Sequence, residues 1–237
     1  MRPTALITGA SRGIGAASAE LLAKNGHDLL LVARSLDALE QLADALRQWG
    51  GRVEVAAIDL ARPETIAAPL TALCGGGNPP TVVINNAGVA YTGSLATMPL
   101  ERWQWLLQLN LTSVLQVCQV MLPMLRQAGG GRIINISSHA ARNAFPDWGA
   151  YCVSKAALAS LSRCLAEEER AHGIGVSTLT LGAVNTPLWD SESVDSSFDR
   201  RAMLDPHRVA EAVLYLAQQP PAQQVDDLTL MPAAGVL

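Results

Sequence analysis

The sequence predicts an α/β fold: one doubly wound domain, residues 1–237, with a seven-stranded parallel sheet flanked by helices on both faces. Two observations predict it. Short apolar runs of strand length alternate with helix-like stretches along the whole chain. Several of these runs are apolar without interruption, as expected for parallel strands that are covered on both faces.

Seven apolar runs are expected to form the strands, because each is short and lies between turn or helix signals. In chain order they are Ala5–Thr8, Asp28–Ala33, Val53–Ile58, Val82–Asn85, Arg132–Ser137, Val176–Leu181 and Leu228–Met231. The helix-like stretches between them are Ile14–Asn25, Leu36–Trp49, Pro63–Leu73, Pro99–Gln127, Ala150–Ala171 and Pro206–Ala217. This order implies βαβ units with right-handed crossovers.

Two segments interrupt the alternation. Gly75–Pro80 is rich in glycine and proline, and a domain boundary is one interpretation. We expect a surface loop instead, because the alternation continues unbroken after it. Trp189–Leu204 is polar and poorly periodic, so it is either disordered or, as its position suggests, a mobile loop over a pocket.

The composition excludes some partners. Apolar residues make up 49% of the chain and charged residues 16%, so it can bury a sizeable core. The formal net charge of −4 argues against nucleic acid and anionic membranes as partners. No apolar run reaches transmembrane length and no signal peptide is recognisable, so we expect a cytoplasmic protein. The four cysteines have neither C-x-x-C nor zinc-ligand spacing, so we expect no metal site.

A glycine-rich turn, Thr8–Gly15, follows the first expected strand and opens the first helix. Glycines there let the backbone approach a pyrophosphate, and the helix N-terminus stabilises its negative charge. The spacing is G-x-x-x-G-x-G rather than G-x-G-x-x-G, and a purely structural turn is the alternative. The candidate cofactor-binding residues of the turn are Gly9, Ser11, Arg12, Gly13, Ile14 and Gly15.

Tyr151 and Lys155 lie one helical turn apart, on the same face of an expected helix. A phenol exchanges a proton with a carbonyl or alcohol oxygen only if its pKa falls from about 10, and a neighbouring ammonium group lowers it. Ser138 supplies a hydroxyl that can donate to the same oxygen. Ser137 competes for this role, but we expect it to point to the opposite side of the strand.

These motifs resemble those of the classical short-chain dehydrogenase/reductases over almost the whole chain. Asn85–Gly88 matches the family's N-N-A-G motif, and Asn110 matches its mid-helix active-site asparagine. The thirteen-residue gap between Ser138 and Tyr151 is typical of the family. The resemblance implies a Rossmann-type fold. It adds as cofactor-binding residues Asp59, Leu60, Asn86, Ala87, Gly88, Gly182, Val184 and Thr186, together with Tyr151 and Lys155.

The resemblance also implies hydride transfer between a nicotinamide and a carbonyl carbon. Tyr151 then donates the proton to the carbonyl oxygen, and Ser138 orients that oxygen. Lys155 binds the ribose and lowers the pKa of Tyr151, and Asn110 holds a water that links Lys155 to solvent.

Four of these polar residues also have structural interpretations. Asn110 could satisfy a neighbouring carbonyl within the fold. Asn85 and Asn86 could merely shape a turn, and Asp59 could cap the next helix.

The end of the second expected strand indicates which nicotinamide cofactor binds. An acidic residue usually binds the ribose 2′-hydroxyl there, but Ala33 occupies this position and Arg34 follows it. Arg12 adds a second guanidinium. Two guanidiniums without a carboxylate suit a 2′-phosphate, so we expect NADP(H). The alternative for Arg34 is a solvated residue that opens the next helix.

The resemblance therefore implies an NADP(H)-dependent carbonyl reductase or alcohol dehydrogenase with a small-molecule substrate. The C-terminal segment lacks an aspartate followed by two glycines, and it resembles the branch of NADP-dependent 3-hydroxy acid dehydrogenases and sepiapterin-reductase-like enzymes. No residue fixes the substrate. Candidates for a mixed apolar and aromatic pocket are Tyr91, His139, Phe145, Trp148, Leu188 and Trp189.

Three other functions remain as alternatives. A 3-oxoacyl thioester reductase is weakened because Arg132 is the only charge near Gly129–Gly131, where such enzymes tend to carry basic residues. A non-catalytic NADP-binding regulator is weakened because Tyr151 and Lys155 are both present. An epimerase or dehydratase would need a larger C-terminal domain.

Relatives imply a homodimer or homotetramer that packs through Pro99–Gln127 and Ala150–Ala171. The sequence does not divide the leucines of these helices between core and interface.

Overall fold

The computed structural model describes residues 2–235 and places the strands in one parallel sheet, in the order β3-β2-β1-β4-β5-β6-β7. The strands are β1 (Thr4–Thr8), β2 (Asp28–Ala33), β3 (Val53–Ala57), β4 (Val82–Asn85), β5 (Gly131–Ser138), β6 (Ile174–Leu181) and β7 (Asp227–Leu230). Every expected strand is present, and its ends match or nearly match the expected ones.

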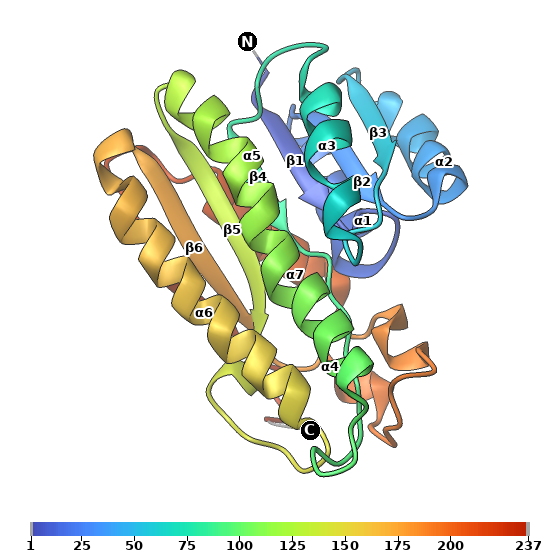
Figure 1. Ribbon diagram of the computed structural model, residues 1–237. Coiled ribbons are helices and arrows are strands. Elements are labelled where there is room, and N and C mark those ends of the chain that lie inside the picture. Colours follow the sequence, from blue (N-terminus) through green and yellow to red (C-terminus); the bar gives the residue numbers. More distant parts are fainter. Residues whose placement is uncertain (1, 236–237) are drawn as a thin grey trace.

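Helices cover both faces of the sheet (Figure 1). On one face lie α1 (Gly13–Lys24), α2 (Leu36–Arg47) and α7 (Pro206–Ala217). On the other lie α3 (Ala67–Cys74), α5 (Ser113–Gln127) and α6 (Gly149–Glu169), with α4 (Leu100–Leu107) preceding α5.

Each strand contributes to both layers, because successive side chains point to opposite faces. Ala5 and Ile7 of β1 face one core, and Leu6 between them faces the other. The predicted α/β class with a doubly wound, seven-stranded sheet is therefore confirmed.

The third helix differs in detail from the prediction. The expected stretch Pro63–Leu73 begins as a 3-10 turn over Pro63–Thr65, and the α-helix starts only at Ala67. Gly75–Pro80 is a loop that returns the chain to β4 of the same sheet, as expected.

The expected helix Pro99–Gln127 is α4 and α5 joined by a single π-helical turn, Gln108–Thr112. By length and composition alone, the 28 residues Leu100–Gln127 could cross a membrane, although the sequence suggested no segment of that length. Half of the most apolar window is buried within the protein, and Val117 and Met121 face the sheet. This environment is that of a core helix.

The structure also divides the leucines of these helices. Six of them are buried: Leu106, Leu109, Leu122, Leu125, Leu158 and Leu165. Leu115 and Val153 are the large apolar side chains of α5 and α6 that stay exposed. Packing against a second copy through these helices stays a prediction.

The strand order creates a crevice at one edge of the sheet. From β1 the chain proceeds to β2 and β3 on one side, and later to β4 on the other. The loops after β1 and β4 therefore diverge, and ligands of open α/β sheets bind at such a point.

Candidate active site

A cleft of about 1020 Å³ opens at the carboxyl ends of β1, β4 and β5, and most predicted site residues line it. They are Gly9, Ser11, Arg12, Gly13, Ile14, Arg34, Leu60, Asn86, Ala87, Gly88, Ser138, Tyr151, Lys155, Gly182, Val184 and Thr186. Three predicted residues lie behind this lining: Gly15, Asp59 and Asn110.

The glycine turn needs its glycines for close packing. Gly9 has a φ of +63°, and a Cβ there would lie 2.8 Å from the Cα of Ala87. A Cβ on Gly15 would overlap the carbonyl oxygen of Gly9, so Gly15 lets α1 pack against the turn. The first turn of α1 has no side-chain cap and no acidic residue, which leaves its N–H groups available to an anion.

Asn86 ties the end of β4 to this turn. Its Nδ2 donates to the carbonyl oxygens of Thr8 at 2.9 Å and of Gly9 at 3.1 Å. The Thr8 hydroxyl in return accepts the backbone N–H groups of Asn86 and Ala87. The structural interpretation of Asn86 is therefore correct, although the residue also faces the cleft.

Ser138, Tyr151 and Lys155 meet at the other end of the cleft. The Lys155 side chain is buried, and its Nζ donates to the carbonyl oxygen of Ile136 at 2.9 Å. The same Nζ lies 5.7 Å from the centroid of the Tyr151 ring. The Ser138 hydroxyl accepts the N–H of Ala140 at 3.1 Å and remains partly exposed to the cleft.

Burial dominates the electrostatics of this group. It raises the pKa of Tyr151 to about 12, although the nearby Ser138 hydroxyl lowers it. Burial also lowers the pKa of Lys155 to about 8. The net shift of the Tyr151 pKa is thus opposite to the expected one, because desolvation outweighs the hydrogen bond of Ser138. Tyr151 is a neutral phenol at neutral pH, which is the form that can donate a proton.

Ser137 also contributes to the cleft lining, and its expected orientation to the opposite side of the strand stays a prediction. Its hydroxyl is buried, however, and makes no hydrogen bond with any residue that the structure describes. Ser138 therefore keeps the more accessible hydroxyl beside Tyr151.

Asn110 sits in the π-helical turn between α4 and α5 and is buried. Its Oδ1 accepts the N–H of Val89, and its Nδ2 donates to the carbonyl oxygen of Val89, both at 2.9 Å. Nδ2 also donates to the hydroxyl of Ser154 at 3.0 Å, and that hydroxyl donates to the carbonyl oxygen of Tyr151. Asn110 thereby connects the loop after β4 with the helix that carries Tyr151. The water that the resemblance assigns to Asn110 stays a prediction.

The glycine-turn end of the cleft is positively charged. Arg12 and Arg34 are exposed there, beside Ala33 and Ser35, and neither forms an ion pair with a described residue. Among residues 2–235, no aspartate or glutamate lines the cleft. This end therefore suits a phosphorylated nucleotide, whereas a free ribose hydroxyl would lack its usual acidic partner.

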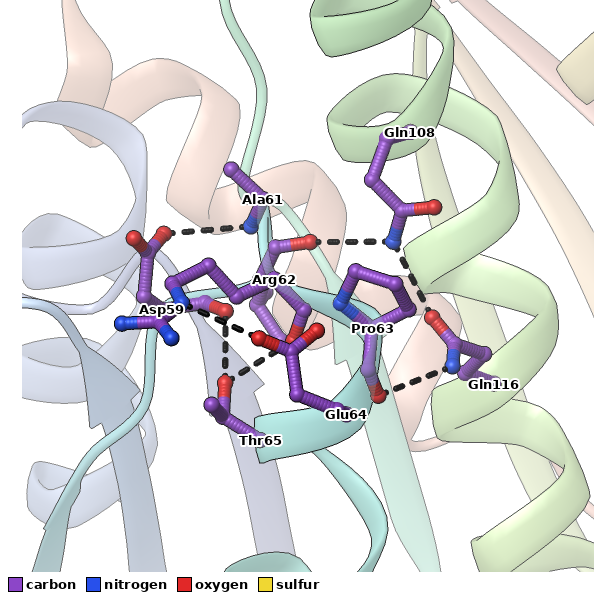
Figure 2. Close-up of polar contacts among 9 residues, drawn as sticks. Asp59, Ala61, Arg62, Pro63, Glu64, Thr65, Gln108 and Gln116 are labelled. Carbon is purple, nitrogen blue, oxygen red and sulfur yellow. Dashed lines mark hydrogen bonds and ion pairs between the residues drawn. The ribbon is translucent and has the colours of Figure 1, made fainter.

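Asp59 does not line the cleft, and Figure 2 shows the contacts that its carboxylate makes instead. Its carboxylate accepts the N–H of Ala61 at 3.1 Å, so it shapes the loop before the 3-10 turn. The same loop is bound to the π-helical turn, because Gln108 Nε2 donates to the carbonyl oxygen of Leu60 at 3.3 Å. Gln116 bridges Gln108 and the carbonyl oxygen of Pro63. Leu60, unlike Asp59, lines the cleft.

The predicted pocket residues gather at the Tyr151 end, with one exception. His139, Phe145, Trp148, Leu188 and Trp189 line the cleft. Tyr91 does not, because its ring packs over Gly93.

Phe198 lines the cleft but has no pattern in the sequence that marks it. It lies in Trp189–Leu204, which the structure shows with defined turns at Pro187–Asp190 and Arg200–Ala202. The segment thus has defined turns beside the cleft, and its mobility stays a prediction. Within residues 2–235, no cluster of three or more His, Cys, Asp or Glu side chains is placed to hold a metal ion.

Comparisons with known proteins agree with this geometry. The family model described as short chain dehydrogenase matches residues 3–196. An uncharacterized oxidoreductase of Staphylococcus saprophyticus is 30% identical over 229 residues, which are 96% of each chain.

Solved structures match with the same coverage. A metagenomic short-chain oxidoreductase in complex with NADP has a TM-score of 0.85 and 32% identity over 98% of this chain and 97% of its own. An alcohol dehydrogenase of the archaeon Thermococcus sibiricus, complexed with 5-hydroxy-NADP, has a TM-score of 0.90 and 30% identity over the same shares.

Proposed function

The chain belongs to the short-chain dehydrogenase family, and on that premise we propose that it is an NADP(H)-dependent oxidoreductase that interconverts a carbonyl compound and its alcohol. The observation that carries the proposal is the composition of one cleft. Ser138, Tyr151 and Lys155 meet at one end, and the glycine turn with two unpaired arginines lies at the other.

The cofactor is held by the predicted residues. The backbone of Gly9–Gly15 and the N-terminus of α1 take the pyrophosphate, and Arg12 and Arg34 take the 2′-phosphate. Lys155 contacts the ribose near Tyr151. When bound, NADPH supplies the hydride. Two similar structures were solved with NADP or an NADP derivative, which supports this choice of cofactor.

Tyr151 is the proton donor in the reducing direction. Its raised pKa keeps the phenol protonated at neutral pH until a developing alkoxide, which is far more basic than a carbonyl, accepts the proton. Ser138 donates a hydrogen bond to the same oxygen and orients it. Lys155, tethered to Ile136, lies close enough to stabilise the phenolate that remains.

The residues themselves disfavour a regulator that binds the cofactor without turnover. Such a protein has no need of a lysine buried beside a tyrosine, because burying a cation costs free energy unless it is used or compensated. The location in the cytoplasm and the dimer or tetramer expected from the sequence are part of the same proposal.

A carbonyl panel tests the proposed function. The purified protein is incubated with NADPH or NADH and with aldehydes, ketones, 3-oxoacyl thioesters and 3-hydroxy acids, and cofactor oxidation or reduction is followed at 340 nm. We expect turnover of at least one carbonyl with NADPH, and a lower kcat/KM with NADH. Measured NADPH binding without any turnover would refute the oxidoreductase and favour the regulator.

A further inference from the structure

The aromatic residues of this chain are distributed unusually. It has five tryptophans, three tyrosines and two phenylalanines, and none of them is among the buried core residues. Aromatic side chains normally dominate protein cores, because each buries a large area. Here five of the ten line the cleft, namely Phe145, Trp148, Tyr151, Trp189 and Phe198. The core is built from aliphatic residues, and the rings are concentrated at the site.

Three of these rings form a continuous surface that starts at the proton donor. Trp148 lies edge-on to Tyr151, with centroids 5.7 Å apart. Trp189 lies 5.7 Å from Trp148, and Phe198 lies edge-on to Trp189 at 5.5 Å. We call Trp148, Trp189 and Phe198 the aromatic wall.

The loop that carries two of these rings is held in place. The indole N–H of Trp189 donates to the carbonyl oxygen of Val184 at 2.8 Å. Arg200 binds Asn185 Oδ1 and the carbonyl oxygen of Thr186, both at 2.8 Å, and Asp190 Oδ1 at 2.9 Å.

The Ser193 hydroxyl of the same loop donates to the carbonyl oxygen of Ala90 at 2.7 Å. A wall held by these contacts needs little ordering when a ring binds, so more of the contact energy remains as affinity.

The polar groups at this end do not suit a charged substrate. The cleft has no acidic lining residue among those described, and the Lys155 ammonium group is bound to Ile136. His139 Nε2 lies 2.8 Å from Asn143 Nδ2, so this nitrogen accepts a hydrogen bond and its lone pair is used. The exposed guanidiniums of Arg12 and Arg34 are at the other end of the cleft, where the cofactor phosphates are proposed to bind.

We propose that the substrate is an uncharged ketone or aldehyde that carries an aromatic ring on its carbonyl carbon, and that this ring packs against the aromatic wall. The proposal rests on the oxidoreductase function proposed above. The carbonyl oxygen must reach the Tyr151 hydroxyl, and a ring one bond from the carbonyl carbon then lies beside Trp148, the first ring of the wall. Edge-to-face or offset packing of aromatic rings gives stabilisation beyond the area they bury.

Two ketones of similar size separate aromatic recognition from general apolar contact. Acetophenone and cyclohexyl methyl ketone differ in the ring, and benzoylformate carries a carboxylate in place of the methyl group of acetophenone. Since the two neutral ketones differ in intrinsic reactivity, the informative quantity is the ratio of their kcat/KM values in the wild type and in variants.

Phe198→Leu and Trp148→Leu should each lower the acetophenone-to-cyclohexyl ratio, by roughly three- to tenfold, which is the range that one aromatic pair contributes. Trp49→Leu is the matched control, because Trp49 lies at the end of α2, away from the cleft, and should leave the ratio unchanged. Benzoylformate should be a poorer substrate than acetophenone. Ratios unaffected by both wall variants, or a preference for benzoylformate, would overturn the proposal.

A binding measurement tests the aromatic wall separately from the proposed oxidoreductase function. Absence of turnover with every carbonyl would refute the oxidoreductase, whereas calorimetry on the NADP⁺-loaded protein still measures affinity for both neutral ketones. Acetophenone should bind more tightly than cyclohexyl methyl ketone, and Phe198→Leu should remove the difference. Equal affinities in the wild type would refute the aromatic wall independently of catalysis.

Discussion

Ser154 connects Asn110 with the helix that carries Tyr151, and the stability lost on removing its hydroxyl can be calculated. The side chain is fully buried. Its hydroxyl accepts from Asn110 Nδ2 at 3.0 Å and donates to the carbonyl oxygen of Tyr151 at 2.8 Å. Ser154→Ala leaves one buried N–H of Asn110 without a partner, which costs about 1–3 kcal/mol.

Part of that cost is offset, because alanine is a better helix former than serine by about 0.5 kcal/mol. We therefore expect a net loss of about 0.5–2.5 kcal/mol in the free energy of unfolding, and a Tm lower by about 1–10 °C for a chain of this size. The assay is guanidinium unfolding followed by circular dichroism, with thermal unfolding beside it.

Ser160→Ala is the matched control. Ser160 lies on the same helix but is exposed, so its substitution should change stability by less than about 0.5 kcal/mol. Equal unfolding free energies of the two variants would show that the buried, hydrogen-bonded Ser154 hydroxyl contributes nothing to stability.

The other predictions concern charge. Burial lowers the pKa of Lys155 to about 8 from 10.5, so between these values the unfolded chain binds more protons and stability rises with pH. Lys155 should therefore make the unfolding free energy rise by about 1.4 kcal/mol per pH unit between pH 8 and 10. Lys155→Met should remove this slope. Parallel profiles of unfolding free energy against pH for the wild type and the variant would contradict the lowered pKa of Lys155. Arg34→Ala should lower kcat/KM for NADPH by about tenfold or more, since a charge-assisted hydrogen bond is lost, and should leave kcat/KM for NADH unchanged. Arg208→Ala, on the exposed surface of α7, is its control, and an equal loss with both cofactors would argue against a 2′-phosphate contact.

The sequence was most informative where local pattern and tertiary structure agree. The apolar runs found all strands, because the inner strands are buried on both faces and consist mainly of apolar residues. The glycine turn was predicted equally well from the sequence, because a Cβ on Gly9 or Gly15 would meet backbone atoms and only glycine fits there.

Features that depend on long-range contacts were harder to predict from the sequence. Asp59 follows its strand as the family motif requires, yet its carboxylate binds Ala61 instead of facing the cleft. Phe198 was missed because aperiodic loops carry no hydrophobic pattern. The π-helical turn at Asn110 has no sequence signature, although such turns often occur at functional sites.

Whether Tyr151 transfers the proton is the central claim, and Tyr151→Phe tests it most directly. The substitution removes one hydroxyl and keeps the ring that packs against Trp148. With the best carbonyl substrate and NADPH, we expect kcat to fall by at least about a hundredfold, as for loss of a general acid, while the Kd for NADPH stays within about twofold. Substantial remaining turnover with normal NADPH binding would show that Tyr151 is not the proton donor.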